Sequence, residues 1–162
     1  MKHHQRTEGK NDEWLTPPEI LRSLGEFYLD PCAPSRPPWV MADYIYRLSS
    51  GEDGLKLPWF NRVWCNPPFN RYVRPKWMAK MAVHGNGIML IPAATETRAF
   101  FDYVWSRADA VCFVRNRPHF HYVDGRRASF NSGTAIALVA YGAANVLALQ
   151  KSGLGQTLVI PH

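Results

Sequence analysis

The segment Asn66-Pro67-Pro68-Phe69 combines residue types that can hold a planar amine. It follows the apolar run Val63-Trp64-Cys65, which predicts a buried strand that ends at a loop. The two prolines have a fixed φ, lack N–H groups and keep the residue before each of them extended. The side-chain oxygen of Asn66 and the carbonyl of Pro67 can therefore point at one place, where they would accept both hydrogens of an exocyclic base amine.

Accepting both hydrogens would change the chemistry of that amine. Its lone pair is delocalised into the base ring, and two accepted hydrogen bonds bias the nitrogen toward a pyramidal geometry that frees the pair for methyl transfer. Phe69 adds a flat face on which an extruded base can stack, a contact worth roughly 1–3 kcal/mol in single-strand binders. The segment predicts base flipping followed by alkylation. The competing interpretation is a rigid turn after a strand, and the flanking motifs favour the chemical one.

Strand and helix signals alternate through the middle of the chain, which predicts an α/β domain with a largely parallel sheet. The predicted strands are residues 27–30, 63–65, 87–92 and 110–114, and the predicted helices are 17–24, 39–48, 73–83 and 97–107. Residues 119–125 and 134–141 predict an antiparallel pair. Ligands of such sheets bind at the carboxyl ends of strands, where Asp30, Asn66 and residues 92–95 fall.

The length and composition predict one domain. With 162 residues, of which 46% are hydrophobic, the chain can bury one sizeable core. Residues 1–12 are polar and predict a flexible N-terminal arm, residues 13–142 carry the domain, and residues 143–162 predict an irregular C-terminal tail. No run approaches the length that spans a membrane, so we expect an unexported, cytoplasmic protein.

The net charge and the cysteine content indicate which partners and which compartment to expect. The net charge of +6 suits a polyanionic partner such as DNA. The three cysteines, Cys32, Cys65 and Cys112, are odd in number and far apart, which argues against a disulfide framework and for a reducing compartment. We expect no metal, because His119 and His121 have no third ligand at a matching spacing.

Five segments together resemble the phage-type DNA N6-adenine methyltransferase family, the short Dam-like proteins of phages and prophages. They are Trp14-Leu15-Thr16-Pro17, Leu29-Asp30-Pro31-Cys32-Ala33, Asp53-Gly54-Leu55, Val63-Trp64-Cys65-Asn66-Pro67-Pro68-Phe69 and Leu90-Ile91-Pro92-Ala93. The resemblance covers about residues 12–142. It implies a Rossmann-like class I methyltransferase fold, S-adenosylmethionine as cofactor, and a location in the cytoplasm of a bacterial host.

The resemblance also assigns roles to residues. The catalytic segment maps to Asn66, Pro67, Pro68 and Phe69. The cofactor-side residues are Trp14, Thr16, Pro17, Asp30, Cys32, Ala33, Asp53 and Leu55. By residue type alone, Asp30 is equally a turn initiator before proline, and a lone Trp14 is more often a core residue. The loop after Asp30 also lacks the glycine-rich turn with which most methyltransferases hold the methionine end of the cofactor.

Basic residues supply the expected DNA surface. The set, which is equally compatible with a solvated rim, comprises Asn70, Arg71, Arg74, Lys76, Arg115, Arg117, His119, Arg126 and Arg127. Other acceptors fit the same catalytic turn, namely cytosine N4, an RNA base or a protein amide, and so does a catalytically silent DNA-binding remnant. Methylation of cytosine carbon 5 is disfavoured, because Cys65 precedes Asn66 and does not follow a proline.

Overall fold

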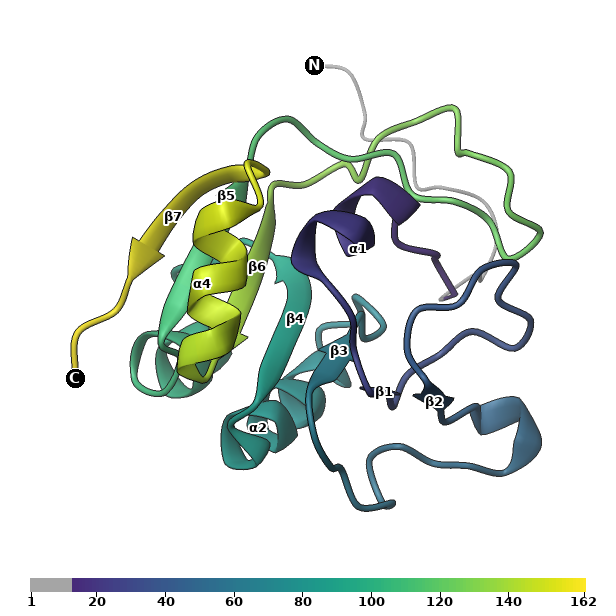
Figure 1. The fold of residues 1–162 in the computed structure, drawn as a ribbon, viewed down its shortest axis with the longest axis horizontal. Coiled ribbons are helices and arrows are strands. Elements are labelled where there is room, and N and C mark those ends of the chain that lie inside the picture. The colour runs from purple at the N-terminus through teal and green to yellow at the C-terminus, as the bar shows by residue number, and fades with distance from the viewer. Residues whose placement is uncertain (1–12) are drawn as a thin grey trace.

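Residues 13–162, the part of the chain that the computed structural model describes, fold around a mixed sheet of seven strands (Figure 1). The strands are β1 (Leu29–Asp30), β2 (Tyr44–Ile45), β3 (Val63–Cys65), β4 (Gly87–Pro92), β5 (Ala110–Val114), β6 (Ile136–Tyr141) and β7 (Gly155–Val159). The helices are α1 (Pro18–Leu24), α2 (Arg74–His84), α3 (Arg98–Phe100) with the π-helical turn η2 (Phe101–Trp105), α4 (Ala143–Lys151) and the 3-10 turn η1 (Leu48–Ser50).

The sheet has a parallel half and an antiparallel half. Its strand order is β2-β1-β3-β4-β6-β5-β7. The neighbours from β2 to β4 are all parallel, whereas β6 is antiparallel to both β4 and β5, and β7 is antiparallel to β5. The prediction of a largely parallel sheet is therefore met in the first half only, and the fold is an α/β domain with a mixed sheet.

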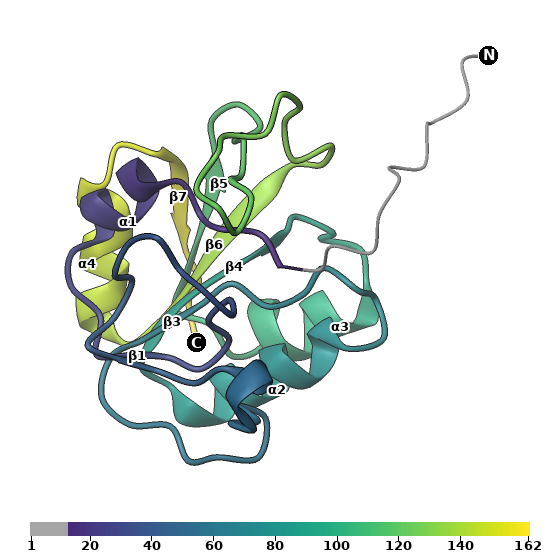
Figure 2. The same cartoon turned by 90° about the vertical axis from the view of Figure 1, so that its right-hand side faces the viewer.

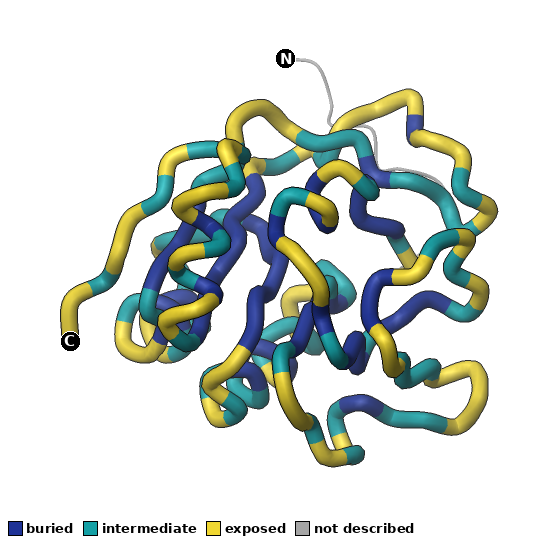
Figure 3. The backbone as a smooth tube through the Cα atoms, viewed as in Figure 1, coloured by how far each residue is buried: buried dark blue, intermediate teal, exposed yellow. Residues whose placement is uncertain are grey.

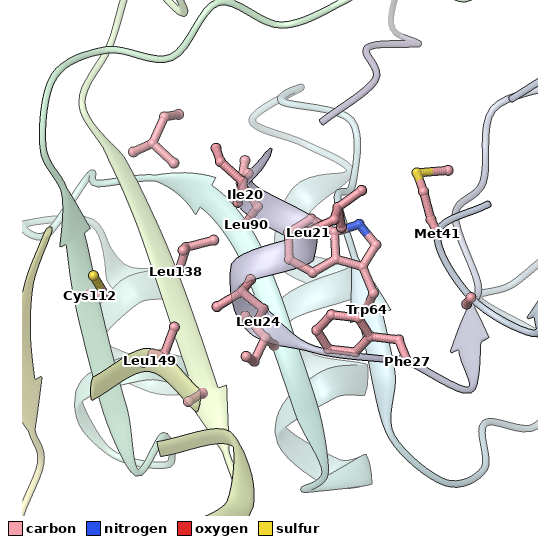
Figure 4. Close-up of a cluster of buried hydrophobic side chains, with 14 of the residues drawn as sticks. Ile20, Leu21, Leu24, Phe27, Met41, Trp64, Leu90, Cys112, Leu138 and Leu149 are labelled. Carbon is pink, nitrogen blue, oxygen red and sulfur yellow. The ribbon is translucent and has the colours of Figure 1, made fainter. Parts of the chain in front are cut away.

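Helices cover both faces of the sheet (Figure 2). On one face, Leu24 of α1 and Leu149 of α4 pack with strand residues such as Trp64 and Leu138 (Figure 4). The opposite face is covered by α2 and α3, whose Met78 and Phe100 belong to a second cluster of buried residues. Side chains alternate along each strand, so Trp64 faces the first cluster while its neighbours Val63 and Cys65 face the second. The central strands are buried along their length (Figure 3).

Most of the predicted elements in the middle of the chain are confirmed. The predicted helices 17–24, 73–83 and 97–107 correspond to α1, α2 and α3 with η2. The predicted strands 63–65, 87–92 and 110–114 correspond to β3, β4 and β5. The strand expected at 27–30 is confirmed only for its last two residues.

Three other predictions are wrong. Residues 39–48 form no helix: Tyr44–Ile45 pairs in parallel with β1, so tertiary pairing overrides the local pattern. Residues 119–125 form no strand and make only isolated bridges, Leu15 with His121 and His121 with Arg127. The other strand of that predicted pair, residues 134–141, corresponds to β6, which pairs with β4 and β5 instead.

The third correction concerns residues 143–162, which are not irregular. They contain α4, rich in the helix-favouring residues Ala and Leu, and β7, which pairs along all of β5 from Gly155 to Val159. The N-terminal arm expected at residues 1–12 lies outside the described residues.

Candidate functional site

A cavity of about 430 Å³ lies at the carboxyl ends of the parallel strands β1, β2 and β3. The residues that follow these strands line it, including Pro31 to Pro34 after β1, Tyr46 after β2, and Asn66 and Pro68 after β3. Val73, which directly precedes α2, and Trp77 of α2 also line the cavity, and Glu13 and Trp14 close it from the N-terminal side. This is the edge of a sheet at which ligands of α/β domains bind.

Asn66 has a fixed side-chain orientation in this cavity. Its Nδ2 donates to the carbonyl of Trp14 at 2.9 Å and to the hydroxyl Oγ1 of Thr16 at 3.2 Å. Because a carbonyl oxygen only accepts, the atom that faces Trp14 must be the nitrogen. Among residues 13–162 no donor occupies Oδ1, so Asn66 presents an acceptor at the cavity wall.

The other three residues of the predicted catalytic segment have different environments. Pro67 is buried and Pro68 lines the cavity beside Asn66. Phe69 is half-buried, and its ring meets that of Phe120 edge to face, with centroids 5.8 Å apart. Phe69 is not among the residues that line the cavity. Its backbone carbonyl accepts a hydrogen bond of 3.1 Å from Arg74 of α2, which ties the segment to the helix that follows it.

Asp30 lies behind the cavity wall. Its side chain is 2% exposed, and its Oδ1 accepts a hydrogen bond of 2.9 Å from the backbone N–H of Cys32. Burial raises the pKa of Asp30 to about 7, and the Cys32 N–H opposes that change. Burial, with the charge of Asp30, also raises the pKa of the Cys32 thiol. The bond between the two residues gives the loop after β1 a fixed form without a glycine-rich turn.

The turn at residues 52–57 forms another part of the wall, to which residues 52–55 contribute. Oδ1 of Asp53 accepts from the backbone N–H of Leu55 at 3.0 Å, and its Oδ2 lies 3.3 Å from Nζ of Lys56. The pKa of Asp53 is lowered, first by the Leu55 N–H and then by Lys56. Nζ of Lys80 donates to the carbonyls of Leu55 and Leu57 at 2.9 and 2.6 Å, which fixes this turn against α2.

The structure brings most of the predicted site residues together. Those that line one cavity are Trp14, Cys32, Ala33, Asp53, Leu55, Asn66 and Pro68. Thr16, Pro17 and Asp30 are buried behind its wall and do not line it. Nine lining residues were not predicted as site residues: Glu13, Pro31, Pro34, Tyr46, Leu48, Glu52, Gly54, Val73 and Trp77. Val73 and Trp77 were findable, because they stand four residues apart at the start of the helix that follows Asn66.

The cavity suits a cation that carries a flat apolar group. The carboxylate residues Glu13, Glu52 and Asp53 all belong to its wall. Tyr46, Leu48 and Leu55 contribute apolar surface. Trp77 also lines the cavity, and its buried Nε1 has no hydrogen-bond partner among the described residues.

The predicted DNA residues form two groups near this end of the sheet. Asn70, Arg71 and Lys76 are exposed beside the predicted catalytic segment, with Arg74 half-buried. Arg115, Arg117, Arg126 and Arg127 are exposed on the loop of residues 115–134. In this loop Arg126 pairs with Asp124 at 2.7 Å, and Nδ1 of His119 lies 3.0 Å from the carbonyl of Ala128.

The loop of residues 115–134 lies beside the N-terminal segment. Leu15 and His121 exchange two backbone hydrogen bonds of 2.9 and 3.0 Å. The Trp14 ring meets the rings of Tyr122 and Phe130, with centroids 5.1 and 5.9 Å apart. The loop that carries Arg117 therefore contacts the segment of residues 14–16, which also bonds to Asn66.

Within residues 13–162, no group of three or more His, Cys, Asp or Glu side chains is arranged to hold a metal ion. No helix in that part of the chain is long and apolar enough to cross a bilayer. A family model described as DNA N-6-adenine-methyltransferase (Dam) matches residues 3–149. Neither a curated protein nor a solved structure matches the chain.

Proposed function

This chain belongs to the DNA N-6-adenine-methyltransferase (Dam) family, and from that membership we propose that it methylates the N6 amine of adenine in DNA. The methyl donor is S-adenosylmethionine, and the adenine is flipped out of the duplex to reach the cavity. The protein acts in the cytoplasm of a bacterial host, as a phage or prophage product.

The orientation of Asn66 is the observation that carries this proposal. Both hydrogens of its amide are used by Trp14 and Thr16, so its oxygen is left to accept from a ligand. Pro67 and Pro68 remove two N–H groups that would otherwise compete for that acceptor. An acceptor of this kind suits a neutral exocyclic amine, because it places no formal negative charge beside the base.

The cavity residues fit S-adenosylmethionine. The carboxylates of Glu13, Glu52 and Asp53 suit its ammonium and sulfonium charges, and Tyr46, Leu48 and Leu55 suit its adenine ring. When bound, this cofactor supplies an electrophilic methyl group.

The chain itself contributes position and polarity. Asn66 Oδ1 and the Pro67 carbonyl accept the two hydrogens of the adenine amine, which directs the nitrogen lone pair at the methyl group. Phe69 supports the base from the side of Phe120, and the exposed arginines bind the phosphate backbone. The excess proton of the product amine leaves to water after transfer, so no general base is needed.

The fold is consistent with this assignment. A parallel half-sheet with helices on both faces and a ligand cavity at the strand ends supports a Rossmann-like methyltransferase architecture. Between β1 and β3, the strand that precedes Asn66, the chain holds one small strand, β2, in place of the usual pair.

Transfer of labelled methyl from S-adenosylmethionine to unmethylated duplex DNA, followed by nucleoside analysis, tests the proposal. We expect label in N6-methyladenine for the wild type and none for Asn66→Ala, with cofactor affinity nearly unchanged in the variant. Asn61→Ala serves as control, since Asn61 lies at the opposite end of β3. Label in N4-methylcytosine, RNA or protein would identify that substrate, and not adenine N6, as the methyl acceptor. No label in any substrate would indicate a catalytically silent DNA-binding protein.

A further inference from the structure

We propose that Thr16 is a positioning residue for Asn66, whose amide it holds in the orientation that turns Oδ1 toward the substrate. This inference rests on the proposed function and adds to it a residue that acts through Asn66 and not through the cofactor.

The location of Thr16 supports a role at Asn66. Its side chain is 0% exposed and it is not among the residues that line the cavity. Its hydroxyl Oγ1 lies 3.2 Å from Nδ2 of Asn66. A ligand in the cavity is therefore separated from Thr16, whereas the amide that would meet the substrate is in direct contact with it.

The two partners of Asn66 have different effects on the amide. The Trp14 carbonyl, 2.9 Å from Nδ2, excludes the flipped amide, because the flip would bring two acceptor oxygens together. One hydrogen bond alone leaves the amide plane free to rotate about the bond to Cβ. The second bond, to Thr16, fixes that plane and hence the direction in which Oδ1 points.

The segment that carries both partners is itself held in place. Leu15, between Trp14 and Thr16, is 0% exposed and exchanges two backbone hydrogen bonds with His121. Pro17 follows directly and restricts the backbone of Thr16. The hydroxyl therefore has a defined position before any substrate arrives, which is what an orienting group requires.

Thr16→Val removes the hydroxyl and keeps the shape, whereas Thr16→Ser keeps the hydroxyl. Misalignment of Oδ1 weakens its bond to the amine most in the transition state, so the rate constant falls and binding does not. For Thr16→Val we expect a single-turnover rate constant about fivefold to tenfold lower, from the loss of one hydrogen bond. Thr16→Ser should restore the wild-type rate constant, and S-adenosylmethionine and DNA affinities should be unchanged in both.

The matched control is Thr157→Val, the same change on β7 at the far edge of the sheet, which should leave the rate constant unaltered. A wild-type rate constant in Thr16→Val would overturn the proposal. So would a loss of cofactor affinity at an unchanged rate constant, which would place Thr16 at the cofactor.

A second measurement separates this inference from the proposed function. Solvent exchange of the Asn66 side-chain N–H protons, followed by NMR, needs no activity. We expect faster exchange in Thr16→Val than in the wild type and in Thr16→Ser. If the wild type methylates nothing, the proposed function fails, but the exchange rates still show whether the Thr16 hydroxyl holds the Asn66 amide. Equal exchange in all three proteins would overturn the positioning role.

Discussion

Gly54 lies directly against the backbone of Pro31, so that a Cβ at position 54 would come within 1.9 Å of the Pro31 carbonyl oxygen. Gly54 is part of the turn that carries Asp53 and Leu55, and Pro31 directly follows β1. All four residues line the cavity, so this contact joins two of its walls. The indole Nε1 of Trp59 donates to the Gly54 carbonyl at 2.7 Å and holds the turn in that place.

Gly54→Ala should separate these walls. The clash is with backbone atoms, which cannot be relieved by a side-chain rotation, so the turn must move away from Pro31. We expect S-adenosylmethionine affinity to fall at least about tenfold and the free energy of unfolding to fall by about 1–3 kcal/mol, as for other overpacked sites. Calorimetric titration and urea unfolding measure the two effects.

The control for this change is Gly51→Ala in the same loop. Gly51 has a φ of +81°, so alanine there strains the backbone, but its Cβ would meet no atom within 4 Å. Gly51→Ala should therefore lose stability by about 1–2 kcal/mol and keep its cofactor affinity. Equal affinity losses in the two variants would show that loop strain, and not the distance to Pro31, controls binding.

The elements that could be predicted from the sequence are those whose signal is local. The apolar run before Asn66 and the two prolines after it are enough to place a strand end and a rigid loop. Residues Gly87–Pro92 likewise form a continuous apolar run, and Arg74–His84 carries its buried residues Trp77, Met78 and Met81 at helical spacing. The residues Asp53, Cys32 and Trp14 were placed at the site by family resemblance, because no spacing joins three segments so far apart.

The features that could not be predicted depend on distant pairing. β2 has two residues and exists only because it pairs with β1, so it has no periodicity of its own. β6 lies between β4 and β5, but its apolar sequence does not indicate which strands it pairs with. The bonds from Asn66 to Trp14 and Thr16 join residues 52 and 50 positions apart, so no local pattern indicates them.

Asp30 should give the protein a distinctive pH dependence. Its pKa is raised by burial to about 7 in the folded state, against about 3.9 in an unfolded chain. Between these values the folded state binds more protons at this site, so its contribution to stability is full below about pH 4 and is lost as the pH rises through 7. Relative to Asp30→Asn, the wild type should lose on the order of 4 kcal/mol between pH 4 and pH 8.

Urea unfolding of the wild type and Asp30→Asn across that pH range measures the difference. The comparison cancels the other titrating groups, and asparagine can still accept from the Cys32 N–H. Asp43→Asn is a suitable control because it makes the same substitution at an exposed aspartate. Parallel curves for Asp30→Asn and the wild type would mean that Asp30 is charged in the folded protein throughout this range.

Arg115 and Arg107 flank the same strand at opposite ends, and this allows the DNA surface to be tested. Both side chains are exposed, but Arg115 follows the carboxyl end of β5, on the cavity side of the sheet, and Arg107 precedes its amino end. The backbone N–H of Arg115 donates to the Leu154 carbonyl at 2.9 Å, which anchors the start of the loop. Arg115→Gln should weaken binding to duplex DNA about fivefold to tenfold near 0.1 M salt and reduce the slope of log K against log salt by about one.

Fluorescence anisotropy with a labelled duplex at several salt concentrations measures both quantities. Arg107→Gln removes the same charge from the other end of β5, so it should change neither the affinity nor the slope beyond the small effect of net charge. Because phosphate contacts release counterions one by one, a lost contact changes the slope, whereas a change in overall charge acts mainly on the affinity. Equal slopes for Arg115→Gln and the wild type would show that Arg115 does not contact the DNA backbone. The basic residues beside Asn66 would then be the ones expected to bind it.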